Sequence, residues 1–339
     1  GFTVIPKFDR FVFNPKLFLY LSENTDFSFG INSMIENRLG GDMKYVEGKG
    51  DEEHSYFERN KTQRHSSQLT FEHRFDNQNR LNVKNSITYF SRKIEIPDFE
   101  FDGNQLSSFS EVSYIHTKEK TEWVTGANVW TDKFTEKKLT DFPVRDYNMT
   151  TFGLFVQNNT KITDWMNLET GLRTDYITDY ASHVLPRISS YCKRTEKFSS
   201  RIGGGFGYKA PTIFSEDSER IQFQNVLPID DDINKLERSY GANVDFTYKT
   251  GLFNDQVFLS INQLFFYTYL KNPLELQSAD NTRWQFNNID GHVDSKGAET
   301  NMKIKYKDFG LFVGYTYTDA NVKEDGRSYR KTLTPKHKV

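Results

Sequence analysis

Hydrophobic and polar residues alternate along most of this chain, in segments of about ten residues that end at short turns or at longer polar loops. In residues 68–75, for example, Leu69, Phe71 and Phe75 are separated from one another by polar residues. Because successive side chains of a strand point to opposite faces, each segment predicts a strand with one apolar and one polar face. Many such strands in succession are typical of a transmembrane β-barrel.

The alternation predicts roughly fourteen to fifteen strands. They are predicted at residues 11–22, 26–36, 63–75, 80–92, 106–117, 122–134, 146–162, 165–180, 185–195, 198–208, 237–250, 256–270, 283–288, 293–305 and 311–322.

The connections between these strands alternate in length. Short turns, such as residues 76–79 and 118–121, are followed by longer loops. The longer loops are predicted at residues 37–62, 93–105, 135–145 and 209–236. Alternate connections of a meander lie at the same end, so one end is predicted to carry short turns and the other long loops. Outer-membrane barrels show this asymmetry; chance sorting of loop lengths in a large soluble β-domain is the alternative.

The polar faces of the predicted strands carry charges. In residues 237–250, Asn243, Asp245 and Lys249 alternate with Val244 and Phe246. A charge that faces lipid costs up to about 2–4 kcal/mol at mid-depth. These faces are therefore predicted to line a lumen that holds water or a plug, although the exposed face of a soluble sheet would also tolerate them.

Composition argues against several classes of protein. The mean hydropathy is −0.71 and no run of 18 apolar residues exists, which excludes a helical membrane span but not a barrel. The 30 Phe and 18 Tyr residues suit an aromatic girdle. A net charge of −2 argues against nucleic acid as a partner. The single cysteine, Cys192, can form neither an internal disulfide nor a cysteine-based zinc site.

The loop at residues 209–236 is the predicted site of ligand contact, because it follows a glycine-rich strand that permits close backbone approach. The candidate contact residues are Tyr208, Lys209, Phe214, Glu216, Asp217 and Phe223. Aromatic side chains of long loops could stack on a sugar or an aromatic siderophore; they could equally pack the loops together.

The same loop contains Asp230, Asp231 and Asp232. Clustered carboxylates suit Ca²⁺, which prefers six to eight oxygen ligands, although the spacing does not match an EF-hand. A structural calcium site is therefore one interpretation, and a solvated acidic loop is the other. No other cofactor is predicted.

The chain lacks the sequence motifs that would indicate an enzyme. The chain has no Gly-x-Ser-x-Gly nucleophile elbow. It also has no His-Glu-x-x-His zinc motif and no phosphate-binding loop. We therefore nominate no catalytic residue.

Several motifs, taken in order, resemble the barrel of TonB-dependent outer-membrane receptors, especially those of Bacteroides-type bacteria. They are NPKLFLY at 14–20, ENRLGGDM at 36–43, FVQ at 155–157, LETGLRTD at 168–175, LPRI at 185–188, GFGYKAPTIF at 205–214, LERSYGAN at 236–243 and TPKHK at 334–338.

This resemblance implies an all-β antiparallel meander that forms part of a 22-stranded transmembrane barrel in the cell outer membrane. It also implies an N-terminal plug domain and energy from the TonB–ExbB–ExbD complex of the inner membrane. Neither a plug nor the final strands is recognisable in residues 1–339, so we expect the chain to be an incomplete portion of the barrel.

The resemblance implies active import of a scarce small-molecule nutrient, with a ferric siderophore or another metal chelate favoured over cobalamin and oligosaccharide. A passive porin or adhesin-like barrel without a plug is the main alternative. A soluble β-rich binding protein and an outer-membrane enzyme are further alternatives.

Overall fold

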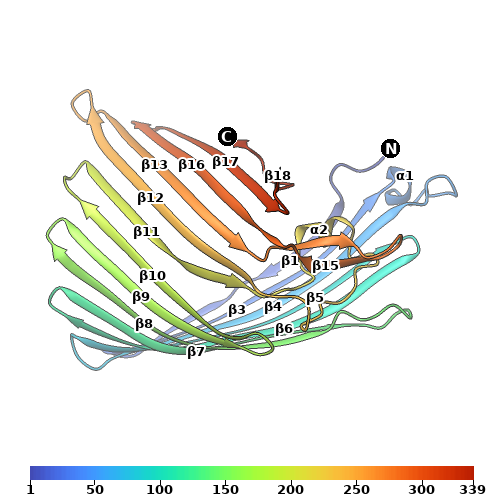
Figure 1. Ribbon diagram of the computed structural model, residues 1–339, viewed down its shortest axis with the longest axis horizontal. Coiled ribbons are helices and arrows are strands. Elements are labelled where there is room, and N and C mark those ends of the chain that lie inside the picture. The colour runs from blue at the N-terminus through green and yellow to red at the C-terminus, as the bar shows by residue number, and fades with distance from the viewer.

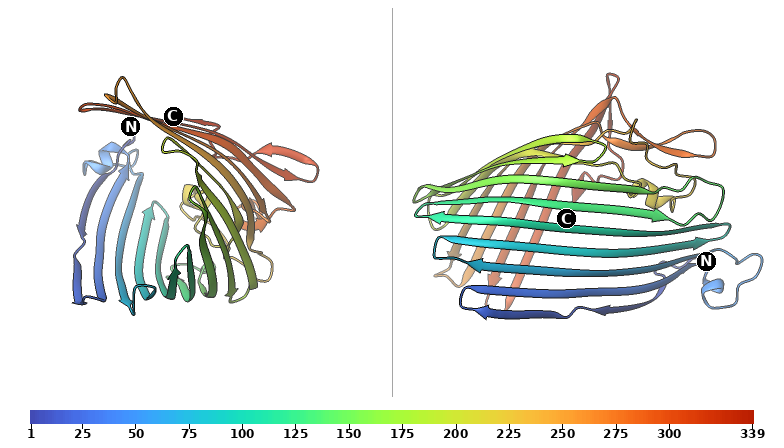
Figure 2. Two further views of the ribbon diagram at one scale, coloured as in Figure 1. Left: turned by 90° about the vertical axis from the view of Figure 1, so that its left-hand side faces the viewer. Right: turned by 90° about the horizontal axis from the view of Figure 1, so that it is seen from below.

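The computed structural model describes residues 1–339 and consists of one long curved sheet with a small hairpin near its rim (Figure 1). The sheet contains 17 strands, and all the strand pairs are antiparallel and follow chain order. Figure 2 shows that the sheet bends around a central space and that its first and last strands remain apart. The prediction of an antiparallel meander forming an incomplete barrel is therefore confirmed.

The elements have the following bounds. The wall contains β1 (Lys7–Phe13), β2 (Lys16–Ser22), β3 (Thr25–Gly41), β4 (Phe57–Arg74), β5 (Asn79–Ile96), β6 (Phe99–Lys118), β7 (Thr121–Glu136), β8 (Tyr147–Thr163), β9 (Met166–Ile177), β10 (Ala181–Lys193), β11 (Phe198–Lys209), β12 (Glu237–Leu252), β13 (Val257–Lys271), β16 (Gly291–Tyr306), β17 (Phe309–Glu324), β18 (Arg327–Arg330) and β19 (His337–Lys338). The hairpin is β14 (Leu274–Ser278) with β15 (Trp284–Asn288), and the helices are α1 (Met43–Val46) and α2 (Glu216–Arg220). Neither helix has the length and hydrophobicity needed to span a bilayer.

The two faces of the wall differ as the alternation predicts. Ile87 is 45% exposed and Leu154 is 66% exposed, and both belong to the outer, apolar face. Only 28 of 339 residues are buried, so no dry core supports this wall. Its backbone is instead satisfied by the strand ladders: 195 of 232 backbone hydrogen bonds lie within helices and strands. A structure exposed to hydrocarbon requires this internal pairing.

The inner face carries charged groups that pair across neighbouring strands. Glu36 of β3 is buried and forms ion pairs with Arg10 of β1 and Arg38 of its own strand. Arg10 and Glu36 are direct partners in the β1–β3 register, so they share a face. The charges therefore lie on the side away from lipid, where the sequence analysis placed them.

The first wall strand is interrupted, which corrects the prediction of one strand at residues 11–22. β1 and β2 both pair with β3 in one continuous register, and Asn14 and Pro15 lie between them. Proline has no backbone N–H and cannot donate to the ladder, so the pairing breaks there and resumes at Lys16.

Strand takes up part of one predicted long loop and nearly all of another. β3 continues to Gly41 and β4 begins at Phe57, which shortens the loop predicted at 37–62. β5 and β6 are joined by Pro97 and Asp98 alone, so the loop predicted at 93–105 was wrong. Around Gly41 and Phe57 both faces of the strand ends are mostly polar, so the alternation that reveals a strand is lost there. Around Pro97 the alternation continues, with Ile94 and Phe101 in the hydrophobic cluster at the mouth and Glu95 and Glu100 on the opposite face.

The strand predicted at 283–288 is present as β15, but it pairs with β14 in a separate two-stranded sheet and not with the wall. The end of the barrel with long loops holds some short connections as well, such as residues 178–180 between β9 and β10. The predicted sorting of loop lengths therefore holds for the short-turn end and only partly for the other.

Candidate ligand-entry site at the mouth of the barrel

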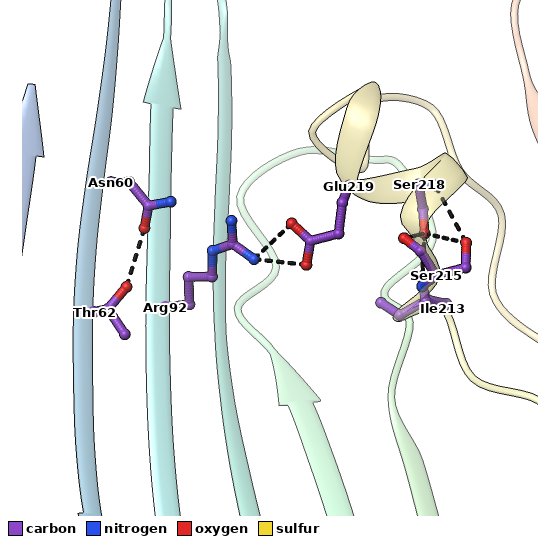
Figure 3. A network of polar contacts seen from close by, with 7 residues as sticks. All are labelled: Asn60, Thr62, Arg92, Ile213, Ser215, Ser218 and Glu219. Carbon is purple, nitrogen blue, oxygen red and sulfur yellow. Dashed lines mark hydrogen bonds and ion pairs between the residues drawn. The ribbon is translucent and has the colours of Figure 1, made fainter. Parts of the chain in front are cut away.

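Residues 210–236, which join β11 to β12, fold back into the mouth of the barrel instead of extending away from it (Figure 2). Their only helix is α2, which lies against the inner face of the wall near β5 (Figure 3). The loop therefore narrows the entrance on the long-loop side.

Local sequence explains the short helix. The Ser215 hydroxyl accepts a hydrogen bond from the Ser218 backbone N–H, and the Ser218 hydroxyl interacts reciprocally with the Ser215 backbone. This capping box satisfies amides that would otherwise lack a partner at the start of the helix. Ser218 also donates to the Ile213 carbonyl, which ties the helix to the preceding segment.

An ion pair joins the loop to the wall. Arg92 of β5 donates through one nitrogen to both carboxylate oxygens of Glu219, at 2.7 and 2.8 Å (Figure 3). Glu219 belongs to α2, and 127 residues separate the partners in sequence. Hydrogen bonds between charged groups are about twice as strong as neutral ones, so this contact fixes the orientation of the helix.

A hydrophobic cluster anchors the rest of the loop. Phe223 is completely buried, and its ring stacks on Phe101 of β6 with 4.6 Å between centroids. The buried members of the cluster are Ile94, Phe101, Phe134, Ile213, Phe223, Val226 and Phe286. Wall, loop and β14–β15 hairpin each contribute, so the cluster is a small core built at the mouth.

Arg145, in the loop that follows β7, packs against the edge of this core. Its guanidinium pairs with Glu136, lies 5.0 Å from the centre of the Phe101 ring and donates to the Phe223 carbonyl. Both charged groups are almost fully buried. Because each satisfies the other, they can remain charged there.

The β14–β15 hairpin is bound to the loop through its backbone. Leu227 donates to the Trp284 carbonyl at 2.8 Å, and Trp284 donates to the Asn225 carbonyl at 2.9 Å. The buried Asn234 side chain donates to the Phe286 carbonyl at 2.8 Å. Loop and hairpin therefore form one unit across the entrance.

A cavity of about 770 Å³ lies beside this unit and is acidic. Asp179, Asp230, Asp231 and Asp232 line it, and no lysine, arginine or histidine does. The Tyr180 hydroxyl donates to Asp231 at 2.8 Å. Burial and this hydrogen bond raise the pKa of Tyr180, so its phenol stays protonated and available as a donor.

A polar cluster lies on the inner wall near the base of the loop. Arg173 pairs with the buried Asp175 at 2.8 Å and donates to Asn128 at 3.2 Å. Gly153 faces these groups, and a Cβ there would lie 2.6 Å from the oxygens of both Asn128 and Asp175. Only glycine leaves room for the cluster at that position.

The six predicted contact residues occupy different surroundings. Tyr208 donates to Asp175 at 2.8 Å, and Lys209 lies 3.9 Å from Glu237. Phe214 and Phe223 belong to the hydrophobic cluster, which favours the loop-packing interpretation for these two rings. Glu216 and Asp217 begin α2 with exposed or half-exposed side chains. Ligand contact by these residues stays a prediction.

The three predicted metal ligands do not form a preformed site. No group of three or more His, Cys, Asp or Glu side chains is placed to hold a metal ion. Asp230 accepts from the Asp232 backbone N–H at 3.0 Å, as in a turn. A calcium site here stays a prediction.

Sequence reasoning missed the residues that hold the loop in place. Arg92, Arg145 and Glu219 come from three different segments, and no local pattern brings them together. The charged strand end that contains Arg92 was the available signal, since a base on a lumen-facing position requires a partner.

Comparison with known proteins identifies the wall. A family model described as TonB-dependent receptor-like β-barrel matches residues 6–339. The chain belongs to this family. Its location is therefore the outer membrane, as the sequence motifs predicted; the resemblance to Bacteroides-type receptors in particular stays a prediction.

Solved structures of TonB-dependent receptors share the fold at low sequence identity. The siderophore receptor PirA from Pseudomonas aeruginosa is 14% identical with a TM-score of 0.67, and 93% of this chain covers 59% of that one. The ferric-catecholate import receptor Fiu from E. coli K12 is 12% identical with a TM-score of 0.69, and 98% of this chain covers 61% of it.

The copper transporter OprC is 11% identical with a TM-score of 0.72, and 96% of this chain covers 55% of it. The chain thus spans between half and two thirds of the length of these structures. No curated protein sequence matches it significantly.

Proposed function

We propose that the protein containing this barrel is a TonB-dependent receptor that imports a scarce small-molecule nutrient, with a ferric siderophore or another metal chelate as the favoured cargo. Membership of the receptor family carries this proposal. Structural neighbours that are named as siderophore receptors and as a copper transporter support metal-containing cargo. The family consists of transport receptors, and we assign no catalytic step to this chain.

The mouth of the barrel suits selective entry. Loop 210–236 and the β14–β15 hairpin are held by Phe223, Arg145 and the Arg92–Glu219 pair, so the entrance has a defined shape. Acidic groups line the cavity beside it, and the lumen wall below is polar. In the proposed mechanism a nutrient binds at this entrance and passes along the polar wall once a plug is displaced by the TonB–ExbB–ExbD complex.

Uptake by cells tests the proposal directly. A deletion strain, and the same strain carrying the full-length protein, are compared for growth on ferric siderophores, copper, cobalamin and oligosaccharides as limiting nutrients. We expect the full-length protein to restore growth on one metal chelate and to lose this effect when TonB is deleted or the proton gradient is dissipated.

The passive porin or adhesin-like alternative gives opposite results. A porin would restore growth on several small solutes without TonB, and purified full-length protein would make liposomes permeable to sugars. Growth that is independent of TonB would therefore overturn the proposed energy coupling, even if a cargo were found.

A further inference from the structure

Two neighbouring polar side chains, Asn85 of β5 and Ser110 of β6, lie on the lipid-facing side of the wall. Asn85 is two residues from Ile87, and Ser110 is two residues from Val112. Both apolar neighbours are exposed on the outer face, and an even spacing along a strand keeps the same face. Asn85 and Ser110 are also direct partners in the β5–β6 register, so they lie side by side. We call them the polar pair.

The polar pair lies at mid-depth in the apolar belt. Asn85 is four residues from the exposed Tyr89 on the long-loop side, and Ser110 is four residues from the exposed Tyr114 on the short-turn side. Aromatic residues of this kind mark the two membrane interfaces. At about 3.3 Å per residue and a strand tilt of about 40°, four residues correspond to about 10 Å along the membrane normal. Hydrocarbon at this depth offers no water to a polar group.

The chain itself satisfies the polar pair only in part. The Asn85 amide nitrogen donates to the Ser110 hydroxyl at 2.8 Å and to the Phe109 carbonyl at 3.4 Å. The Asn85 side-chain oxygen accepts no hydrogen bond, and the Ser110 hydroxyl donates none. The register partners on either side are apolar, namely Leu69 of β4 and Val129 of β7. A free acceptor and a free donor therefore lie next to each other and face lipid.

A second amide on the outer face is satisfied differently. Gln263 of β13 is two residues from the exposed Phe265 and shares its face. The Gln263 oxygen accepts from the Thr300 hydroxyl of β16 at 2.6 Å, and its nitrogen donates to the Leu264 carbonyl at 3.2 Å. Both ends of this amide have partners within the chain, whereas the polar pair leaves a donor and an acceptor open.

We propose that the polar pair is the centre of a lipid-embedded contact with a second copy of this chain. Two copies inserted in the same direction are related by a twofold axis along the membrane normal, and such an interface is self-complementary. When the axis passes between β5 and β6, Asn85 of each copy faces Ser110 of the other. Each free oxygen then meets a free hydroxyl, which lipid tails cannot provide.

The surface around the polar pair permits a close approach. Ser67 of β4 and Ser108 of β6 flank Ile87 in the register, and both are small. Small residues allow membrane-embedded surfaces to come close together. Because the strands of both copies are tilted, they cross where the two convex walls meet. The contact is therefore concentrated around one point, and two hydrogen bonds at that point form a large part of it.

Energy transfer between labelled copies tests the proposal. Full-length protein that carries a donor or an acceptor dye at its N-terminus is mixed in phospholipid vesicles, and transfer is measured as the density of protein in the bilayer increases. We expect the wild type to dimerise. Asn85→Leu should need about a tenfold higher density, because both reciprocal hydrogen bonds include Asn85. Leucine is at home against lipid, so this variant should keep its fold.

Matched variants separate the polar pair from a general effect of polarity. Gln263→Leu removes an amide from the other sector and should leave dimerisation unchanged. Ser110→Ala removes the free donor and should weaken dimerisation as Asn85→Leu does, which keeps the test open if one of the two variants does not fold. Ser110→Thr retains the hydroxyl and should preserve the dimer.

Cysteine cross-linking tests the geometry. In full-length protein free of other cysteines, with Cys192→Ser, copies with Asn85→Cys are mixed with copies with Ser110→Cys. The mixture should cross-link faster than either variant alone, because the axis places position 85 of one copy against position 110 of the other. The proposal is wrong if the wild type stays monomeric at every density, as when a hydroxylated acyl chain or a different protein covers the pair. Dimers that Asn85→Leu and Ser110→Ala do not weaken, or no preference for the mixed cross-link, would overturn it equally.

Discussion

Phe223 is a loop residue with no exposed surface, which is unusual because loops generally run over the outside of a protein. Its ring stacks on Phe101, and its carbonyl accepts a hydrogen bond from Arg145. This one residue thus joins the loop both to the wall and to the loop that follows β7. At the residue scale, Phe223 is therefore a central anchor of the cluster that holds the entrance.

Phe223→Ala should release the loop. Truncation of a buried phenylalanine costs about 3–5 kcal/mol, and here the loss falls on the docked state of residues 210–236. Limited proteolysis of the full-length protein should show faster cleavage within this loop. Phe253→Ala, which changes an exposed residue in the turn after β12, is the matched control and should leave the cleavage rate unaltered.

The stability of the turn between β14 and β15 depends on pH through Asp280. Hydrogen bonds from the Thr282 backbone, and then from Arg283, hold the pKa of Asp280 below the ordinary value of about 3.9. A lowered acid pKa stabilises the folded turn above the ordinary pKa, and this contribution disappears as the pH falls towards the lowered value.

Hydrogen exchange of residues 274–288 measures this effect. After correction for intrinsic rates, exchange should be slow at pH 6 and faster at pH 3. Asp280→Asn should remove most of the difference between the two values of pH; a turn that stays equally protected at both would contradict this role of the carboxylate.

At the element scale, loop 210–236 and the β14–β15 hairpin form a unit whose position depends on buried charge. Arg145 and Glu136 lie in a region with little solvent, so each needs the other. The nearby pair of Arg220 with Asp217 is much more exposed and has 3.9 Å between its charged atoms. These two ion pairs differ in burial, and this predicts different consequences when they are broken.

Arg145→Met should loosen the entrance strongly. It leaves the Glu136 carboxylate buried without a partner, which costs about 3–5 kcal/mol. Hydrogen exchange in residues 210–236 and 137–146 should increase.

Arg220→Met breaks an exposed pair that is worth about 0–1 kcal/mol, so it should change little. The double change Arg145→Met with Glu136→Met should be milder than Arg145→Met alone, because no charge then remains buried. A double variant as unstable as the single one would show that packing of the arginine, and not charge, holds the loop.

At the scale of the whole molecule, the alternation of apolar and polar residues decides which side of the wall meets lipid. Leu154 of β8 is 66% exposed on the outer face, and Asn159 of the same strand lines a cavity on the inner face. The two positions are an odd number of residues apart, so their side chains point to opposite faces of the wall. The same substitution made at each position therefore compares the cost of a charge on the two faces.

Leu154→Arg should impair insertion, because an arginine facing lipid costs about 2–4 kcal/mol near the bilayer midplane. Asn159→Arg places the same charge on the lumen side and should cost less than about 1 kcal/mol. Unfolding of the full-length protein by denaturant in phospholipid vesicles gives both values. Equal destabilisation by the two changes would contradict the assignment of the faces.

Much of this architecture was predictable from the sequence. Period-two alternation located most of the wall strands, because each strand must present apolar side chains to lipid wherever it crosses the membrane. The ordered motifs indicated the receptor family. The predictions failed where this constraint ends. The strand ends around Gly41 and Phe57 carry mostly polar residues on both faces, those around Pro97 turn their apolar side chains towards the mouth, and β15 pairs outside the wall.

The amino-acid sequence by itself determined the antiparallel wall, its apolar and polar faces and the short turns at one end, since these depend on neighbouring residues along each strand. Only the tertiary structure decided how the mouth is built. Arg92, Phe101, Arg145 and Phe223 meet because the curved wall brings β5, β6 and two loops to the same place. Contacts between segments so distant in the chain leave no periodic pattern, and they form only when the sheet has curved around them.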